Sequence, residues 1–168
     1  MLFYLPLLCS FCNNYSMLAL SKKTDYGLIA LCHLATAPEV LFSARKIAEN
    51  YGMSGALLMN VLKSLTRNGL VESTRGVNGG YKLLRDPANI TLAELVCAIE
   101  GPPKFVACAE IDRNVQKKDS FDQKSQVFDC NLAQACPVKS PVRKVHRKMI
   151  DFLEGITIAD LVNDNIGQ

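Results

Sequence analysis

The sequence lacks several features that would have indicated other classes of protein. It has no tryptophan, only two histidines, and a formal net charge of only +3. So small a charge excludes a bulk polycation and an acidic disordered tail, while 49% apolar residues are enough for a real core. The apolar run near the N-terminus, residues 2–9, is far too short to span a bilayer, so we expect no membrane partner.

Catalytic patterns are missing as well. We find no nucleophile paired with a base and no phosphate-binding loop. The two histidines, His33 and His146, are interpreted as a helix-surface or core residue and as a neighbour of an apolar helix seam, respectively. We therefore predict that the protein is not an enzyme.

The first sixteen residues differ from the rest of the chain. They carry no charge, and they lack the basic region and the small-x-small cleavage site of a signal peptide. Because Met17 follows at once, we interpret 1–16 as a non-native or disordered leader. The alternative is a real leader in which Cys9 and Cys12 bind metal or do redox chemistry.

The positive charge lies in one half of the chain. Residues 22–87 hold nine basic and five acidic side chains, a net of +4, whereas residues 88–139 are close to neutral. This distribution indicates a polyanion partner for the first half. We divide the chain into a leader (1–16), a DNA-binding domain (17–103), a cysteine-containing loop (104–139) and a dimerisation segment (140–168).

The first half has the pattern of a winged helix, so we predict a mainly α fold with a small β-hairpin. Apolar spacing predicts a helix over 24–36, a short helix over 44–49 and a third helix that follows Ser54. Two short helices joined by a glycine-containing turn are typical of a helix-turn-helix unit. Strands over 70–75 and 81–85, joined by a glycine-rich turn, then form the wing.

The third helix has a polar face of the side-chain types that read base edges and hold phosphates. The alternative for this helix alone is an ordinary solvated face. Arg75 at the tip of the wing suits a narrow minor groove, and the glycines of the turn allow tight turning and close approach to phosphates. The predicted DNA contacts are Lys22, Ser43, Ser54, Asn60, Lys63, Arg67, Arg75 and Gly79.

The second half contains two further helices with clear start signals. Thr91 and Glu94 form a capping box for a helix that ends at Glu100. Ser140 and Pro141 are predicted to open a long helix with a heptad seam suited to a partner helix, although packing on its own domain is the alternative. The seam consists of Val142, Val145, Met149, Phe152 and Ile156.

Cysteine is unusually frequent in this chain, with seven residues. An odd number cannot be fully paired in disulfides within one chain, and seven in 168 residues is too sparse for a small disulfide-rich scaffold. Cys32 and Cys97 lie on predicted helices and are interpreted as small residues in or near the core. Cys108, Cys130 and Cys136 share the polar, aperiodic loop, where thiolates are free to converge on a metal. The alternative is free thiols or a single disulfide.

Together these segments resemble the Rrf-two family of winged-helix transcription regulators, whose members include IscR and NsrR. The resemblance covers 17–163, is most specific in the wing, and looks closest to the subgroup that regulates the SUF iron–sulfur assembly operon. The matching segments are residues 20–27, 44–48, 65–71, the wing Arg75-Gly-x-x-Gly-Gly-Tyr81, Thr91–Glu94, Ile99–Gly101 and the three-cysteine loop.

The resemblance implies a DNA-binding dimer crossed by the long helix, with an iron–sulfur cluster on Cys108, Cys130 and Cys136. The cluster would be 2Fe-2S, with 4Fe-4S as the alternative. Here 21 residues separate Cys108 from Cys130, more than is usual in the family, and Lys139 stands where IscR-like members have a histidine ligand. A protonated lysine cannot ligate, so the resemblance to NsrR implies Asp25 of the partner subunit as the fourth ligand.

We therefore expect a cytoplasmic, homodimeric, cluster-sensing repressor of a SUF operon that binds a palindromic operator in double-stranded DNA. Two alternatives have the same fold. One is a regulator that senses nitric oxide or redox state, and the other is a cluster-free regulator of cysteine metabolism that acts through thiol chemistry.

Overall fold

The computed structural model describes residues 20–76, 79–103 and 136–163, and there it is mostly helical with one two-stranded antiparallel sheet. The predicted fold class is confirmed. The elements are α1 (Lys22–Ala35), α2 (Ala44–Asn50), α3 (Gly55–Arg67), β1 (Val71–Thr74), β2 (Gly80–Leu83), the 3-10 helix η1 (Pro87–Asn89), α4 (Leu92–Glu100), α5 (Lys139–Glu154) and α6 (Ile158–Asn163).

The core lies where α1 packs against α3, α4 and α6. The apolar spacing of α3 places Leu58, Leu62 and Leu65 on one face, and all three are fully buried. Gly27 of α1 is also buried, and a Cβ there would meet the side chains of Ile99 and Leu95 on α4. The absence of a side chain at Gly27 therefore allows α1 to lie close against α4.

The wing is the β1–β2 hairpin, in which Val71 pairs with Leu83 and Thr74 pairs with Gly80. A third segment joins it, because the Phe42 N–H donates to the Tyr81 carbonyl and the Tyr81 N–H to the Phe42 carbonyl, each at 2.9 Å. This pairing attaches β2, at the residue after Gly80, to the chain just before α2. It is not visible in the sequence, since Val40, Leu41 and Phe42 form an apolar run of only three residues.

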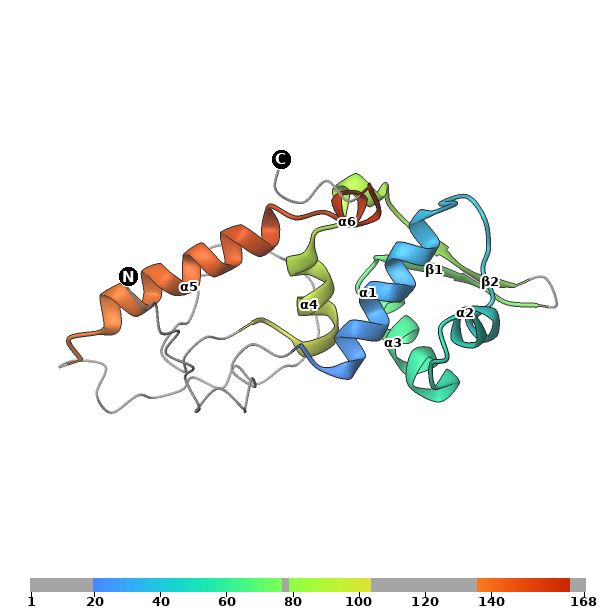
Figure 1. The fold of residues 1–168 in the computed structure, drawn as a ribbon, viewed down its shortest axis with the longest axis horizontal. Coiled ribbons are helices and arrows are strands. Elements are labelled where there is room, and N and C mark those ends of the chain that lie inside the picture. The colour runs from blue at the N-terminus through green and yellow to red at the C-terminus, as the bar shows by residue number, and fades with distance from the viewer. Residues whose placement is uncertain (1–19, 77–78, 104–135, 164–168) are drawn as a thin grey trace, which may run out of the picture.

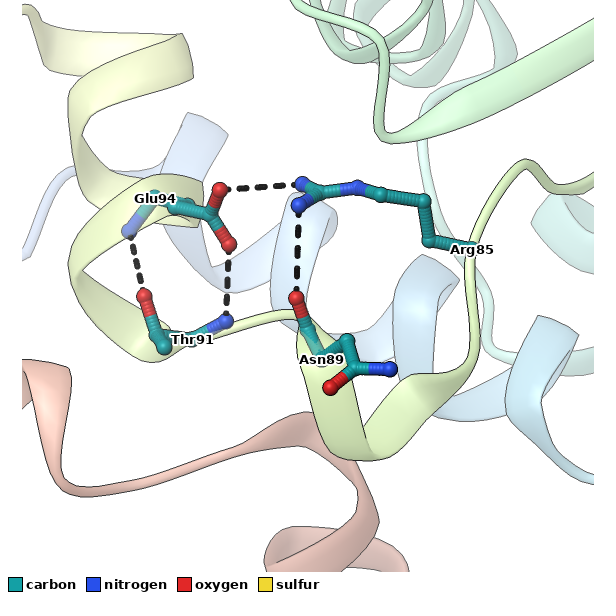
Figure 2. A network of polar contacts seen from close by, with 4 residues as sticks. All are labelled: Arg85, Asn89, Thr91 and Glu94. Carbon is teal, nitrogen blue, oxygen red and sulfur yellow. Dashed lines mark hydrogen bonds and ion pairs between the residues drawn. The ribbon is translucent and has the colours of Figure 1, made fainter.

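A polar network fixes the exit of the wing on α4 (Figure 2). Arg85 donates to a Glu94 carboxylate oxygen at 3.0 Å and to the Asn89 carbonyl at 3.3 Å. The same carboxylate accepts the Thr91 N–H at 3.1 Å, while the Thr91 hydroxyl accepts the Glu94 N–H at 3.2 Å. The predicted capping box is thus present, and Arg85 extends it to the wing.

The C-terminal segment returns to the same place. The Leu92 N–H donates to the Ile156 carbonyl at 2.8 Å, and the Ile158 N–H donates to the Ile90 carbonyl at 2.9 Å. Helix α5 projects away from the body as an arm, on the side of α4 opposite to α2, α3 and the wing (Figure 1). One end of that arm is therefore anchored beside the Arg85–Glu94 network.

Two sequence-based details differ from the structure. Helix α5 begins at Lys139 with Val138 as N-cap, so Ser140 and Pro141 lie inside its first turn rather than opening it. A proline is tolerated there because the N–H groups of the first turn have no helical partner. Cys97 is exposed, not near the core, whereas Cys32 is half-buried against the core as predicted.

In the described ranges, no helix is both long and apolar enough to cross a membrane.

Candidate nucleic-acid interface and cysteine site

The solvent face of α3 carries the residues that the sequence assigned to base and phosphate contacts. Asn60, Lys63 and Arg67 are exposed along this face, and Ser54 is exposed at its N-cap. Ser64 belongs to another side of the helix, because its hydroxyl donates to the Ala98 carbonyl of α4 at 2.7 Å. The structure therefore leaves a continuous polar and cationic face on α3.

The start of α1 meets the start of α3. The hydroxyl of Tyr26 accepts the Ser54 N–H at 3.1 Å. Lys22 lies over the same ring, with its Nζ 5.9 Å from the ring centroid. This arrangement places Lys22 near the N-terminus of α3, and its contact with a phosphate stays a prediction. Sequence reasoning missed Tyr26, whose buried ring resembles any other apolar position of α1.

Helix α2 contributes a second edge to this surface. Ser43 is its N-cap residue, as predicted, but its hydroxyl makes no capping hydrogen bond in the structure. The hydroxyl is thus available for another acceptor or donor. Arg45 and Glu49 are exposed one turn apart and pair at 2.8 Å. Because that ion pair is exposed, it adds little to stability.

The glycines of the wing allow the backbone to turn tightly and to approach itself closely. Gly76 has a φ of +118°, which side-chain-bearing residues rarely adopt. The Gly79 N–H donates to the Gly76 carbonyl at 3.0 Å, and a Cβ on Gly79 would meet the Thr74 carbonyl. The predicted tight turn is present, and the close approach seen here is to Thr74. Contact between Gly79 and a phosphate stays a prediction.

Arg75 lies between β1 and the turn, and it is exposed. Within the described residues no hydrogen bond or ion pair is recorded for its guanidinium. The other cation on this hairpin, Lys82, differs because it lies 3.5 Å from the Glu72 carboxylate on the neighbouring strand. Arg75 is therefore the wing cation with the fewer competing partners.

The cysteine loop is described only at its end. Cys108 and Cys130 lie outside the described residues, and Cys136 is half-buried three residues before α5. Burial raises the pKa of the Cys32 thiol, which disfavours a thiolate and agrees with a packing role. No group of three potential metal ligands gathers in the part of the chain that the structure describes.

The first turn of α1 contacts the end of α4. The Glu100 carboxylate, at the end of α4, accepts hydrogen bonds from the Ser21 hydroxyl and, at 2.6 Å, from the Thr24 hydroxyl. Asp25 is exposed in this same turn, and the loop starts four residues after Glu100. The structure thus places Asp25 in the turn that contacts the end of α4, and a role for Asp25 as a ligand stays a prediction.

We expect Thr24→Val to destabilise the protein at neutral pH but not in acid. The Ser21 and Thr24 hydroxyls lower the pKa of Glu100 in the folded protein. The ionised Glu100 carboxylate therefore stabilises the fold at pH values above its pKa in the unfolded chain, and this contribution is lost as pH falls through its lowered pKa in the folded protein. Loss of one hydrogen bond should cost roughly 1 kcal/mol at about pH 7. Urea unfolding at about pH 7 and about pH 3 would measure this.

Thr24→Ser is the matched control, because it keeps the hydroxyl and should retain most of the stability. Thr24 is fully buried, so a loss that persists unchanged in acid would indicate a packing defect instead of the Glu100 hydrogen bond.

A helix-turn-helix followed by a two-stranded wing, with a cationic outer helix, defines a winged-helix DNA-binding protein. The chain belongs to the Rrf2, or Rrf-two, family, described as an iron-dependent transcriptional regulator, whose profile matches residues 20–164. A relative from Rhizobium meliloti (strain 1021), protein aau3, is 34% identical over 143 residues, which cover 85% of this chain and 84% of the relative.

Solved structures agree with this assignment. T. potens IscR is 28% identical, with a TM-score of 0.60 and 88% of each chain covered. CymR, the global cysteine regulator of B. subtilis, is 25% identical, with a TM-score of 0.62, and the match covers 87% of this chain and 97% of CymR. The protein is therefore a transcriptional regulator of the IscR and CymR type.

Proposed function

We propose that this protein is a homodimeric repressor that senses an iron–sulfur cluster and controls an iron–sulfur assembly (SUF) operon. The family description and the similarity to IscR support this proposal. The position of Cys136 is the structural observation that favours it most. Cys136 lies three residues before the outer end of the arm, so a ligand on its thiol would connect the state of the loop to α5.

The donor chemistry at the end of the loop fits such a cluster. Iron–sulfur clusters are held by cysteine thiolates. Cys136 is half-buried, and its carbonyl accepts the Lys139 N–H at 3.4 Å as α5 begins. Cys136 would hold the cluster with Cys108, Cys130 and Asp25 of the partner subunit.

When bound, the cluster would link the loop cysteines to one another and change the charge of the site. Both effects would be lost when the cluster is lost or damaged. The residues of this chain provide a path for that change. Glu100 holds the end of α4 against Ser21 and Thr24 at the start of α1, and α1 packs on α3. A shift of a few kcal/mol between two arrangements of this contact would alter the DNA affinity of α3 strongly.

The arm suits a second copy of the chain. Val145 and Phe152 on α5 are 50% and 64% exposed, while Val142 and Met149 of the same seam are half-buried. Large apolar side chains repeated at heptad spacing favour a partner helix. A two-fold dimer would bind a palindromic operator with half-sites about one helical turn apart. The predicted contacts on α1, α2, α3 and the wing would then be used twice.

Anaerobic purification followed by absorption spectra and by iron and sulfide assays tests the cluster. We expect visible absorbance from the wild type and its loss in Cys136→Ser and Cys130→Ala. Cys97→Ser is the matched control, because Cys97 is exposed on α4, outside the loop, and it should stay coloured. A fully coloured Cys136→Ser protein would mean that the ligand set is wrong.

A cluster-free regulator of cysteine metabolism is the second candidate, and the similarity to the cysteine regulator CymR favours it. It predicts wild-type protein without iron or sulfide, whose DNA binding responds to oxidation of thiols. A sensor of nitric oxide or redox state would instead contain iron and sulfide, and would lose DNA binding on exposure to that signal. Scoring operator binding on holo and apo forms of one preparation separates these functions.

A further inference from the structure

An apolar groove lies between α2 and α3. It encloses about 320 Å³, is open to solvent, and its lining is overwhelmingly apolar. Its walls are formed by the residues Ala44, Arg45, Ala48, Glu49, Gly55 and Met59. An exposed apolar hollow of this kind is unexpected on a surface that otherwise presents polar and charged side chains to a polyanion.

The groove exists because its lining residues are small. At Gly55 a Cβ would have nothing within 4 Å, and its backbone does not adopt a positive φ. Neither steric crowding nor backbone conformation therefore requires glycine at this position. Ala44 and Ala48 face it from α2 with single methyl groups. Because Ala44, Ala48 and Gly55 are all small, space is left open beside Met59.

Met59 joins the groove to the predicted DNA-binding face. It is 38% exposed, and its Sδ lies 3.9 Å from the Tyr81 hydroxyl of the wing. Asn60 is the next residue, and Lys63 lies one turn further along the same side of α3. The groove is thus continuous with the cationic face, while at its rim the charges of Arg45 and Glu49 offset one another.

This setting selects one occupant. A surface with Lys63 and Arg67 beside it is complementary to DNA, and the apolar group that the major groove presents is the C5-methyl of thymine. We propose that the groove between α2 and α3 receives a thymine methyl group of the operator, with Met59 as the residue that reads it. The inference rests on the proposed function in one respect, that α3 enters the major groove.

The test uses duplexes selected from a random-sequence DNA pool by the full-length protein. Each thymine of the selected site is replaced by deoxyuridine, which lacks only the methyl group. We expect one symmetric pair of positions at which the replacement weakens binding by about threefold to tenfold per half-site. Met59→Gln should bind both duplexes equally, and Gly55→Val, which fills the groove, should lose affinity for the thymine duplex.

Two control variants isolate Met59. Val40→Gln changes an exposed apolar residue outside the groove, and it should keep the preference for thymine. Tyr81→Phe removes the hydroxyl near Met59 and should also keep it. Circular dichroism verifies that each variant is folded.

Two results would overturn the inference, and they are distinguishable. If the wild type selects a DNA site but no thymine position shows a difference that Met59→Gln abolishes, the groove does not read a methyl group. If the wild type selects no DNA site at all, the proposed function fails as well.

Discussion

Gly80→Ala is expected to destabilise the protein strongly, because it strikes the point where the wing pairs with the segment before α2. A Cβ at Gly80 would lie 2.7 Å from the Phe42 carbonyl oxygen and 2.9 Å from its carbon. These are backbone atoms, which cannot rotate away as the end of a side chain can. The two hydrogen bonds between Phe42 and Tyr81 would have to lengthen or break.

We expect this variant to lose about 2–4 kcal/mol of unfolding free energy, from two weakened hydrogen bonds and from overpacking. Urea unfolding measures the loss. Because Phe42 holds β2 at Tyr81, close to the turn of the wing, DNA affinity should fall by at least tenfold even where the protein stays folded, an order-of-magnitude expectation from the value of a specific contact.

Gly55→Ala is the matched control for stability, since nothing lies within 4 Å of the added methyl group. Its unfolding free energy should change by less than about 0.5 kcal/mol. A Gly80→Ala protein as stable as the wild type would show that Phe42 and the wing shift together at no cost.

Arg75→Ala is expected to have the largest effect on DNA binding among variants that leave the fold intact. The side chain is exposed at the end of β1, next to the turn of the wing. Removing it should therefore change stability by less than about 0.5 kcal/mol. An arginine in a narrow minor groove contributes about 1–3 kcal/mol, so affinity should fall roughly tenfold to a hundredfold.

Fluorescence anisotropy on a selected operator, repeated over a range of salt concentrations, measures both consequences. The salt dependence should decrease by about one phosphate equivalent. Arg75→Lys should restore the salt dependence but not the full affinity, because an ammonium group lacks the planar fork of arginine. The cluster content of both variants should equal that of the wild type.

Lys82→Ala is the control for net charge, because it removes a cation from the same hairpin that is already paired with Glu72. Its effect on affinity should be much smaller than that of Arg75→Ala. Unchanged operator binding by Arg75→Ala would rule out a DNA contact by the tip of the wing.

The local elements were predictable because their signals lie within a few residues of one another. The spacing of Leu58, Leu62 and Leu65 predicted the buried face of α3. Thr91 and Glu94 predicted the start of α4, and Gly101, with a φ of +81°, ends it. Most of the proposed interface followed from these elements, since the polar side chains of α3 point away from its apolar face.

Contacts between distant segments were not predictable in this way. The role of Glu100 depends on Ser21 and Thr24, which are more than seventy residues away. His146 is 4% exposed, with neither ring nitrogen hydrogen-bonded in the described structure, although its place on the helix indicated a position beside an exposed seam. Cys97 was interpreted as a residue in or near the core, but the face of α4 on which it lies is open to solvent.

By itself, the sequence determined the winged-helix class, the order of the helices and the cationic face of α3, because periodicity, capping and turn chemistry act over short distances. Tertiary structure alone decided why the wing glycines are needed, how Arg85 joins the wing to α4, and where a groove opens beside Met59. These features depend on which atoms of distant segments come into contact in the packed fold. Those contacts are set by the whole chain and not by any short segment of it.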